Sequence, residues 1–191
     1  MDTRSLRIAF VLVVGLSGPV CFGGSTPWAD AVVGFLQPPG SSNAGGPPSA
    51  ALGAPDGVFV SVDTPEELIL AFTDNRVFDG PGDDLFITEA GNCGASIDVF
   101  GRRPGGPFVF LGQITNSAGI DLADHLGLNL IESLKFVGVD DSGDFPGFDL
   151  DAVKALNSRD LTPDGCIPAP GAAVLGLIGA SLVGRLRRKI S

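Results

Sequence analysis

The middle of the chain alternates short apolar runs with turn residues, and this pattern predicts β-strands. Residues 58–62 read Val-Phe-Val-Ser-Val, residues 68–72 read Leu-Ile-Leu-Ala-Phe, and Ile97 and Val99 alternate with polar neighbours in 96–100. Runs of this length, bounded by Gly, Pro, Asp and Thr, are typical of strands. The same pattern predicts further strands at 31–36, 85–88, 108–114, 133–139 and 148–153.

The spacing of these runs indicates an all-β fold. About nine short strands recur every 8–12 residues or so, which favours a β-sandwich of jelly-roll type over βαβ units. Residues 37–57 are rich in Gly, Pro, Ser and Ala and predict a long surface loop. Residues 121–131 carry leucines at every fourth position and predict one or two helical turns. Thirteen Phe and no Tyr suit a dry core.

The start of the chain has the plan of a secretory signal peptide. Two arginines precede a compact apolar run at 8–16, and Ser-Gly-Pro then ends it. A run of about ten apolar residues is too short to span a membrane. Cleavage is expected after Ala31, where small residues occupy both required positions, or earlier, near Gly23 or Gly24.

The end of the chain predicts a membrane helix with a basic stop. Residues 167–184 carry no charge, and four cations follow within five residues. Such a segment fits a helix that enters a bilayer and halts with its charges on the cytoplasmic side, although its length is at the lower edge of the roughly 20 residues required. The plain interpretation is a single-span tail anchor that stays attached.

This tail resembles the PEP-CTERM sorting signal of bacterial surface proteins, which an exosortase recognises and cleaves. The likeness rests on a Pro-x-Pro turn, a short apolar helix and a terminal Arg cluster, with Ala169 in place of the family's Glu. It implies export to the cell surface or an extracellular matrix, with an exosortase-type enzyme, the membrane and extracellular polysaccharide as partners. The implied sorting residues are Pro168, Ala169, Pro170, Arg185, Arg187, Arg188 and Lys189.

The body also resembles a known domain. The segments ADAVVGFLQPPG, ALGAPDG, DNRVFDGPGDDLFITEAG and GFDLDAVKALN follow in the same order as in a bacterial cell-surface domain that often precedes PEP-CTERM tails. That domain is similar to the galactose-binding, discoidin-type jelly roll, and the likeness implies a displayed β-sandwich without a defined ligand. The expected division is a signal peptide at 1–31, a β-sandwich at 32–160, a linker at 161–170 and a sorting helix with a basic tail at 171–191.

The charge of the body excludes one class of partner. Between residues 31 and 164 the chain has 20 acidic and six basic residues, a net charge of −14. Binding to a phosphate backbone needs a basic face, so nucleic acid is not expected as a partner. Divalent cations are the natural counter-ions of such a surface.

Two acidic groups are candidate calcium ligands, because Ca²⁺ takes six to eight oxygens from carboxylates and carbonyls. One lies within and just after the Gly-rich turn at 79–84. The other lies near the end of the body and includes Asp140, Asp141 and Asp144. If the last strand lies beside the strand that begins at Leu85, the two groups would form one shell. The alternative is that Asp and Gly only form tight turns, as is expected of Asp56. The predicted ligands are Asp79, Asp83, Glu89, Asp149 and Asp151.

Two cysteines lie outside the signal peptide. Cys93 and Cys166 would pair in an oxidising compartment, or Cys166 would remain alone beside the processing site. Their spacing does not match the paired C-x-x-C signatures of zinc sites.

Catalysis is not expected. His125 is the single histidine, no G-x-S-x-G motif is present, and the surplus of carboxylates singles out no catalytic pair. The sequence therefore predicts an exported, structural or adhesive β-sandwich stabilised by calcium. The alternative is a carbohydrate-binding module of the galactose-binding-like class, in which Arg102, Arg103 and Asn116 would supply polar contacts. An exposed Phe on a loop would favour that alternative, because sugars stack on aromatic rings.

Overall fold

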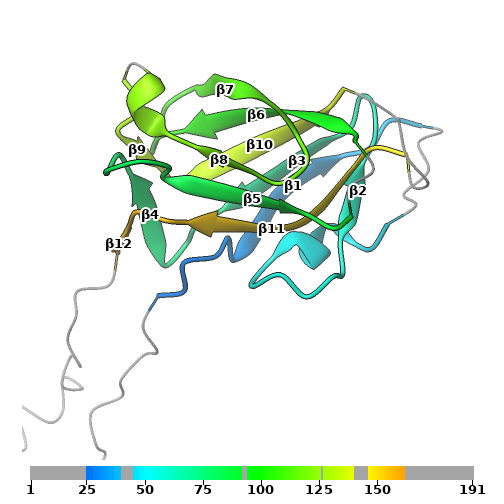
Figure 1. Cartoon of the computed structure of the whole chain (residues 1–191), viewed down its shortest axis with the longest axis horizontal. Coiled ribbons are helices and arrows are strands. Elements are labelled where there is room, and N and C mark those ends of the chain that lie inside the picture. The colour runs from blue at the N-terminus through cyan, green and yellow to red at the C-terminus, as the bar shows by residue number, and fades with distance from the viewer. Residues whose placement is uncertain (1–24, 40–44, 92–93, 126, 140–145, 162–191) are drawn as a thin grey trace, which may run out of the picture. The chain divides into compact units, whose positions relative to one another are not determined.

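A computed structural model describes residues 25–39, 45–91, 94–125, 127–139 and 146–161, all within one compact unit, Gly24–Asp164 (Figure 1). These residues form twelve strands and two short 3₁₀ turns, η1 (Pro48–Ala51) and η2 (Leu122–Asp124), so the fold is all-β, as predicted. None of the described residues belongs to a helix long and apolar enough to cross a membrane. The predicted signal-peptide core, the sorting residues, both cysteines and Asp140, Asp141 and Asp144 lie outside the described residues.

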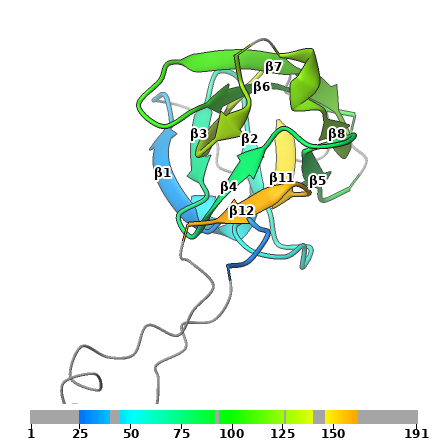
Figure 2. The same cartoon turned by 90° about the vertical axis from the view of Figure 1, so that its left-hand side faces the viewer.

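Two larger antiparallel sheets face one another (Figures 1 and 2). The first has the order β1 (Ala31–Leu36), β3 (Glu67–Ala71), β10 (Ser133–Gly138), β6 (Ser96–Arg102) and β7 (Phe108–Thr115). The second has the order β2 (Val60–Val62), β11 (Phe148–Ala155), β5 (Leu85–Glu89) and β8 (Ala118–Ile120).

A small third sheet closes one end of this pair, the left-hand end in Figure 1. Its strands are β12 (Ser158–Asp160), β4 (Asn75–Phe78) and β9 (Leu130–Ile131).

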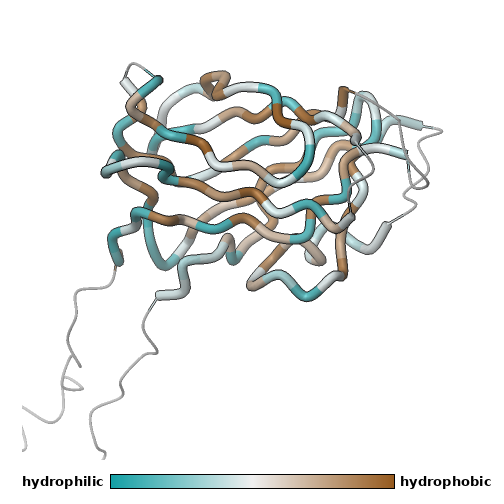
Figure 3. The backbone as a smooth tube through the Cα atoms, viewed as in Figure 1, coloured by the Kyte–Doolittle hydropathy of each residue, from teal (hydrophilic) through white to brown (hydrophobic). Residues whose placement is uncertain are grey.

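The core forms where the inward sides of the two larger sheets meet. Leu68 and Leu70 of β3, and Phe136 of β10, are fully buried from one sheet, and Ile87 of β5 and Phe148 of β11 are fully buried from the other. Alternate residues point to opposite faces of a strand, so the alternation in the sequence becomes one dry and one wetter face. Figure 3 shows the apolar stretches concentrated on the strands.

The structure has a strand at each of the eight ranges that the apolar runs predicted; the range 31–36 keeps its ends, and the other seven differ by one or two residues. It adds four short ones: β4, β8, β9 and β12. The predicted helical stretch at 121–131 is only partly right. Leu122–Asp124 forms one 3₁₀ turn, but Leu130–Ile131 is strand β9, because it pairs with Val77 and Phe78 of β4. Tertiary pairing overrides the local spacing there.

Candidate functional site

The predicted calcium ligands lie at two ends of strand β5. Strand β11 does lie beside β5, as the sequence hypothesis required, with Leu150 opposite Glu89 and Ala155 opposite Leu85. Asp79 and Asp83 precede the start of β5, whereas Glu89 is its last residue. Four residues of strand span about 13 Å. The structure therefore does not bring Asp79 and Glu89 together.

Glu89 and Asp149 lie near each other on the neighbouring strands β5 and β11 but do not share a face. Leu150 is the residue opposite Glu89, and Asp149 pairs instead with Ser61 of β2. Because neighbouring residues of a strand point to opposite faces, Asp149 faces away from the side on which Leu150 and Glu89 lie. The five predicted ligands are thus divided among three places.

One group of three carboxylates does converge. Single carboxylate oxygens of Asp79, Asp84 and Asp121 all lie within 4.8 Å of one another. Sequence reasoning missed Asp121, because only the pairing of β5 with β8, Leu85 opposite Ile120, brings it to this turn. Asp83 lies beside the group, and its carboxylate packs on Gly119, where an added methyl group would be 2.0 Å from Asp83 Oδ2.

Asp84 is buried and holds this end of the sheet together through hydrogen bonds. Its Oδ1 accepts the backbone N–H of Gly80 at 2.8 Å and the side-chain amide of Asn157 at 2.7 Å. Its Oδ2 accepts the backbone N–H of Leu122 at 2.8 Å. A carboxylate has about four acceptor positions, so three are used by the fold. An ion bound here would rely mainly on Asp79 and Asp121.

The second acidic place is strand β11, where both carboxylates have protein partners. The hydroxyl of Ser61 donates to Asp149 at 2.5 Å. Burial raises the pKa of Asp149, and the Ser61 hydrogen bond lowers it by less. Asp151 accepts the backbone N–H groups of Asp56 and Gly57 at 3.2 and 3.1 Å. Two motifs far apart in the sequence, ALGAPDG and GFDLDAV, therefore meet in space.

Asp56 has the role of a turn residue, as expected. Its carboxylate accepts the backbone N–H of Val58 at 2.9 Å, and Gly57 has a φ of +82°. Asp151 fixes the loop that follows η1 onto the sheet, and Asp149 bonds to Ser61 of the neighbouring strand β2. Their geometry is that of structural hydrogen-bond acceptors.

The outer side of the five-stranded sheet carries an aromatic face, defined here as Phe100, Phe108, Phe110, Arg102 and Lys135. Phe100 lies opposite Phe110, and Arg102 lies opposite Phe108 on β6 and β7. The rings of Phe100 and Phe110 are edge to face at 5.3 Å. Lys135 Nζ is 4.8 Å from the centre of the Phe100 ring, and the Arg102 guanidinium is 4.7 Å from that of Phe108.

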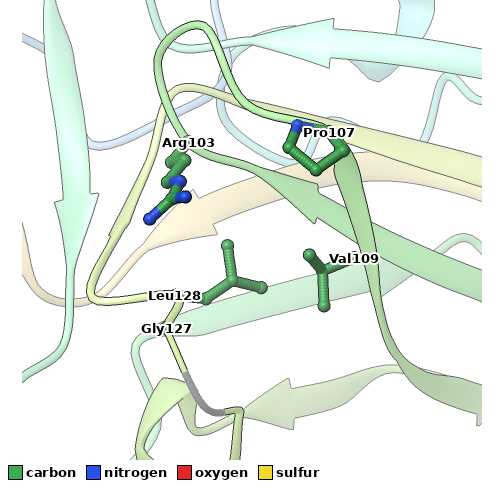
Figure 4. A pocket seen from close by; sticks show the side chains of 5 residues that line it. All are labelled: Arg103, Pro107, Val109, Gly127 and Leu128. Atoms are coloured by element: carbon green, nitrogen blue, oxygen red, sulfur yellow. The ribbon is translucent and has the colours of Figure 1, made fainter.

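Arg103 and Asn116, the other polar residues considered for sugar contact, are not part of the aromatic face. Arg103 lines a pocket of about 130 Å³ with Pro107, Val109, Gly127 and Leu128 (Figure 4). Asn116 occupies the turn between β7 and β8 with a φ of 63°. Its position is explained by the turn, since Asn tolerates this left-handed backbone better than most residues.

Comparison with known proteins adds no assignment, since no family model and no curated protein matches the chain.

Proposed function

We propose that the chain is an exported bacterial protein, sorted to the cell surface by an exosortase, whose jelly-roll body has a structural or adhesive role. The observation that supports this proposal is that the first and last described residues of the body lie side by side. The carboxylate of Asp74 accepts the backbone N–H of Thr26 at 3.0 Å. The backbone carbonyl of Asp74 accepts the N–H of Leu161 at 2.9 Å. The hydroxyl of Ser25 also donates to Asp160.

This geometry suits display from a single attachment point. The chain enters and leaves the body at the same end, beside the small sheet of β4, β9 and β12. A tail anchored in the membrane would hold that end, and the loops at the opposite end would face outwards. Residues 168–189, which resemble a PEP-CTERM signal, would form this anchor.

The jelly-roll assignment is supported by the order in which the strands are used. Strands β1, β3, β6, β7 and β10 belong to one sheet, while β2, β5, β8 and β11 belong to the other. The chain thus crosses from sheet to sheet repeatedly. Such crossing between two antiparallel sheets is typical of double-sheet jelly rolls.

The contacts of residues 27–30 support the earlier of the two signal-peptide cleavage positions. The buried Ala29 donates its N–H to Val153 at 2.9 Å, and the carbonyl of Pro27 accepts the N–H of Ala155 at 2.6 Å. The carboxylate of Asp30 accepts the N–H of Thr73 at 2.9 Å. Cleavage after Ala31 would remove all three contacts, so we place the cut near Gly23 or Gly24.

Calcium is the cofactor that fits the acidic turn region. Asp79, Asp84 and Asp121 offer only oxygen ligands, and hard cations such as Ca²⁺ prefer such ligands. In this proposal the ion stabilises the junction of the 79–84 turn with η2.

Surface retention tests the proposal. Deleting residues 168–191 should release the body from cells that express an exosortase, whereas removing only Ser191 should leave it attached. Replacing the four terminal cations by Ala should also release it or prevent its processing. Retention that is unchanged after the whole tail is deleted would contradict sorting by this segment.

A carbohydrate-binding module is the second candidate, and the aromatic face favours it. Phe110 is 50% exposed on β7, next to Phe100 and within the same face as Lys135 and Arg102. A flat apolar ring beside cations is the surface on which a sugar ring with acidic substituents would stack. In this proposal acidic polysaccharide is the ligand.

A glycan panel tests the second candidate. Phe110→Ala should reduce binding to uronate-containing polysaccharide at least tenfold. Phe86→Ala is the matched control, since Phe86 is 38% exposed on the other sheet. Equal binding by both variants and the unchanged chain would exclude the aromatic face as a sugar site.

A further inference from the structure

The turn between β2 and β3 contains a fully buried carboxylate with an unused oxygen. Glu66 has 0% of its surface exposed, and its Oε1 has no hydrogen-bond partner. Among the described residues no ion pair reaches Glu66. An ionised carboxylate in such a place is strongly disfavoured unless a cation or several donors compensate it.

A second buried carboxylate belongs to the same turn. Asp63 is 5% exposed, its backbone N–H donates to Glu66 Oε2 at 3.2 Å, and its carbonyl accepts the N–H of Glu66 at 2.6 Å. The Glu66 carboxylate is therefore folded back onto the residue that carries the other carboxylate. The turn between β2 and β3 therefore contains two buried carboxylates, those of Asp63 and Glu66.

Backbone oxygens gather at the same turn. A methyl group added to Gly147 would lie 2.5 Å from the carbonyl oxygen of Val62 and 2.6 Å from Asp63 Oδ1. A methyl group added to Gly138 would lie 2.1 Å from the carbonyl oxygen of Asp63 and 2.6 Å from that of Val62. Two glycines thus let β10 and β11 approach a cluster of oxygen atoms with no side chain intervening.

We propose that Asp63 and Glu66 bind a divalent cation, Ca²⁺ by its chemistry, at the β2–β3 turn. The polar atoms at this turn are carboxylate and carbonyl oxygens, which Ca²⁺ accepts in irregular numbers and geometries, whereas Mg²⁺ demands near-octahedral order. This site is separate from the group of Asp79, Asp84 and Asp121 and does not depend on the surface-display proposal. Its role is to tie the crossover between the two large sheets.

Calorimetric titration of the chelator-treated full chain with CaCl₂ tests this inference. Glu66→Gln keeps the shape of the side chain and removes its charge, and it should eliminate one binding event or weaken it at least tenfold. Asp79→Asn is the matched control and should leave that event unchanged. Identical titrations of Glu66→Gln and the unchanged chain, or no Ca²⁺ binding by the unchanged chain, would overturn the proposal.

A direct measurement covers the case in which Glu66→Gln fails to fold. Crystals of the unchanged chain soaked with a lanthanide, which replaces Ca²⁺ at oxygen sites, give an anomalous signal at the ion. A peak beside Asp63 and Glu66 is the expected result. A peak only at Asp79, Asp84 and Asp121, or no peak, would overturn the inference.

Discussion

Ser61 on β2 donates its hydroxyl to the buried carboxylate of Asp149 on β11 at 2.5 Å, and the two residues lie directly opposite each other in the sheet. Burial raises the pKa of Asp149 above its ordinary value of 3.8, despite the opposing effect of the Ser61 hydrogen bond. The folded protein therefore holds a proton at Asp149 at pH values at which the unfolded chain has released it.

Asp149 thus contributes a stability that falls as the pH rises. In the window between 3.8 and the raised folded pKa, the folded state binds more protons than the unfolded state, so the free energy of unfolding decreases with pH. Asp149→Asn should remove this slope. Unfolding by urea at a series of pH values measures it. Asp98→Asn, on an exposed carboxylate bonded to Gln113, is the control; an unchanged slope in Asp149→Asn would refute the assignment.

Asp84 should be the least replaceable acid of the 79–84 turn. Asp84→Asn presents an NH₂ group to donors that now bind both carboxylate oxygens, and a buried unsatisfied group costs about 1–3 kcal/mol. We expect a loss of about 2 kcal/mol or more in the free energy of unfolding. Asp83→Asn, next in the chain, should change it little. Equal losses in the two variants would contradict the role assigned to Asp84.

Alanine substitutions at Gly138 and Gly34, both in the five-stranded sheet, compare a tightly packed glycine with a loosely packed one. Gly138→Ala would place a methyl group 2.1 Å from the carbonyl of Asp63, whereas in Gly34→Ala the nearest atom is 3.6 Å away. Overpacking of this kind costs about 1–3 kcal/mol. Gly34→Ala should be neutral or should stabilise by up to about 1 kcal/mol. Thermal unfolding of the two variants measures the contrast, and a tolerated Gly138→Ala would show that the β2–β3 turn is loosely held.

Removal of residues 25–31 should destabilise the body. A chain beginning at Val32 lacks the hydrogen bonds of Ala29 with Val153, Pro27 with Ala155 and Asp30 with Thr73. These are three of the hydrogen bonds that residues 25–31 make with the rest of the body, and each contributes about 1 kcal/mol, so we expect a loss of at least about 3 kcal/mol compared with a chain that begins at Ser25. Equal melting of the two chains would favour cleavage after Ala31.

The strands that could be predicted were those with strong apolar runs, because burial on one face imposes the alternation seen at Ile97 and Val99. Strands β4 and β12 were not predictable. Asn75-Arg-Val-Phe and Ser158-Arg-Asp carry no such pattern. They are strands because they pair with each other over more than 80 residues of sequence, and β4 pairs with β9 as well. Long-range pairing leaves no local signal.

The acidic sites show the same limit. The 79–84 turn was a candidate because its carboxylates cluster in the sequence, but Asp121 joins them only through the pairing of β5 with β8. Glu66 gave no sequence signal, since a Glu after Pro in a turn is ordinarily exposed. Its complete burial follows from the approach of β10 and β11 to the turn.

The intact mass of the mature protein recovered from the cell surface tests the account most directly. Export followed by exosortase processing predicts a species that begins near Ser25 and lacks the residues after the Pro168-Ala169-Pro170 turn. Recovery of the unprocessed chain, from Met1 to Ser191, in the cytoplasmic fraction would contradict both the export and the sorting of this protein.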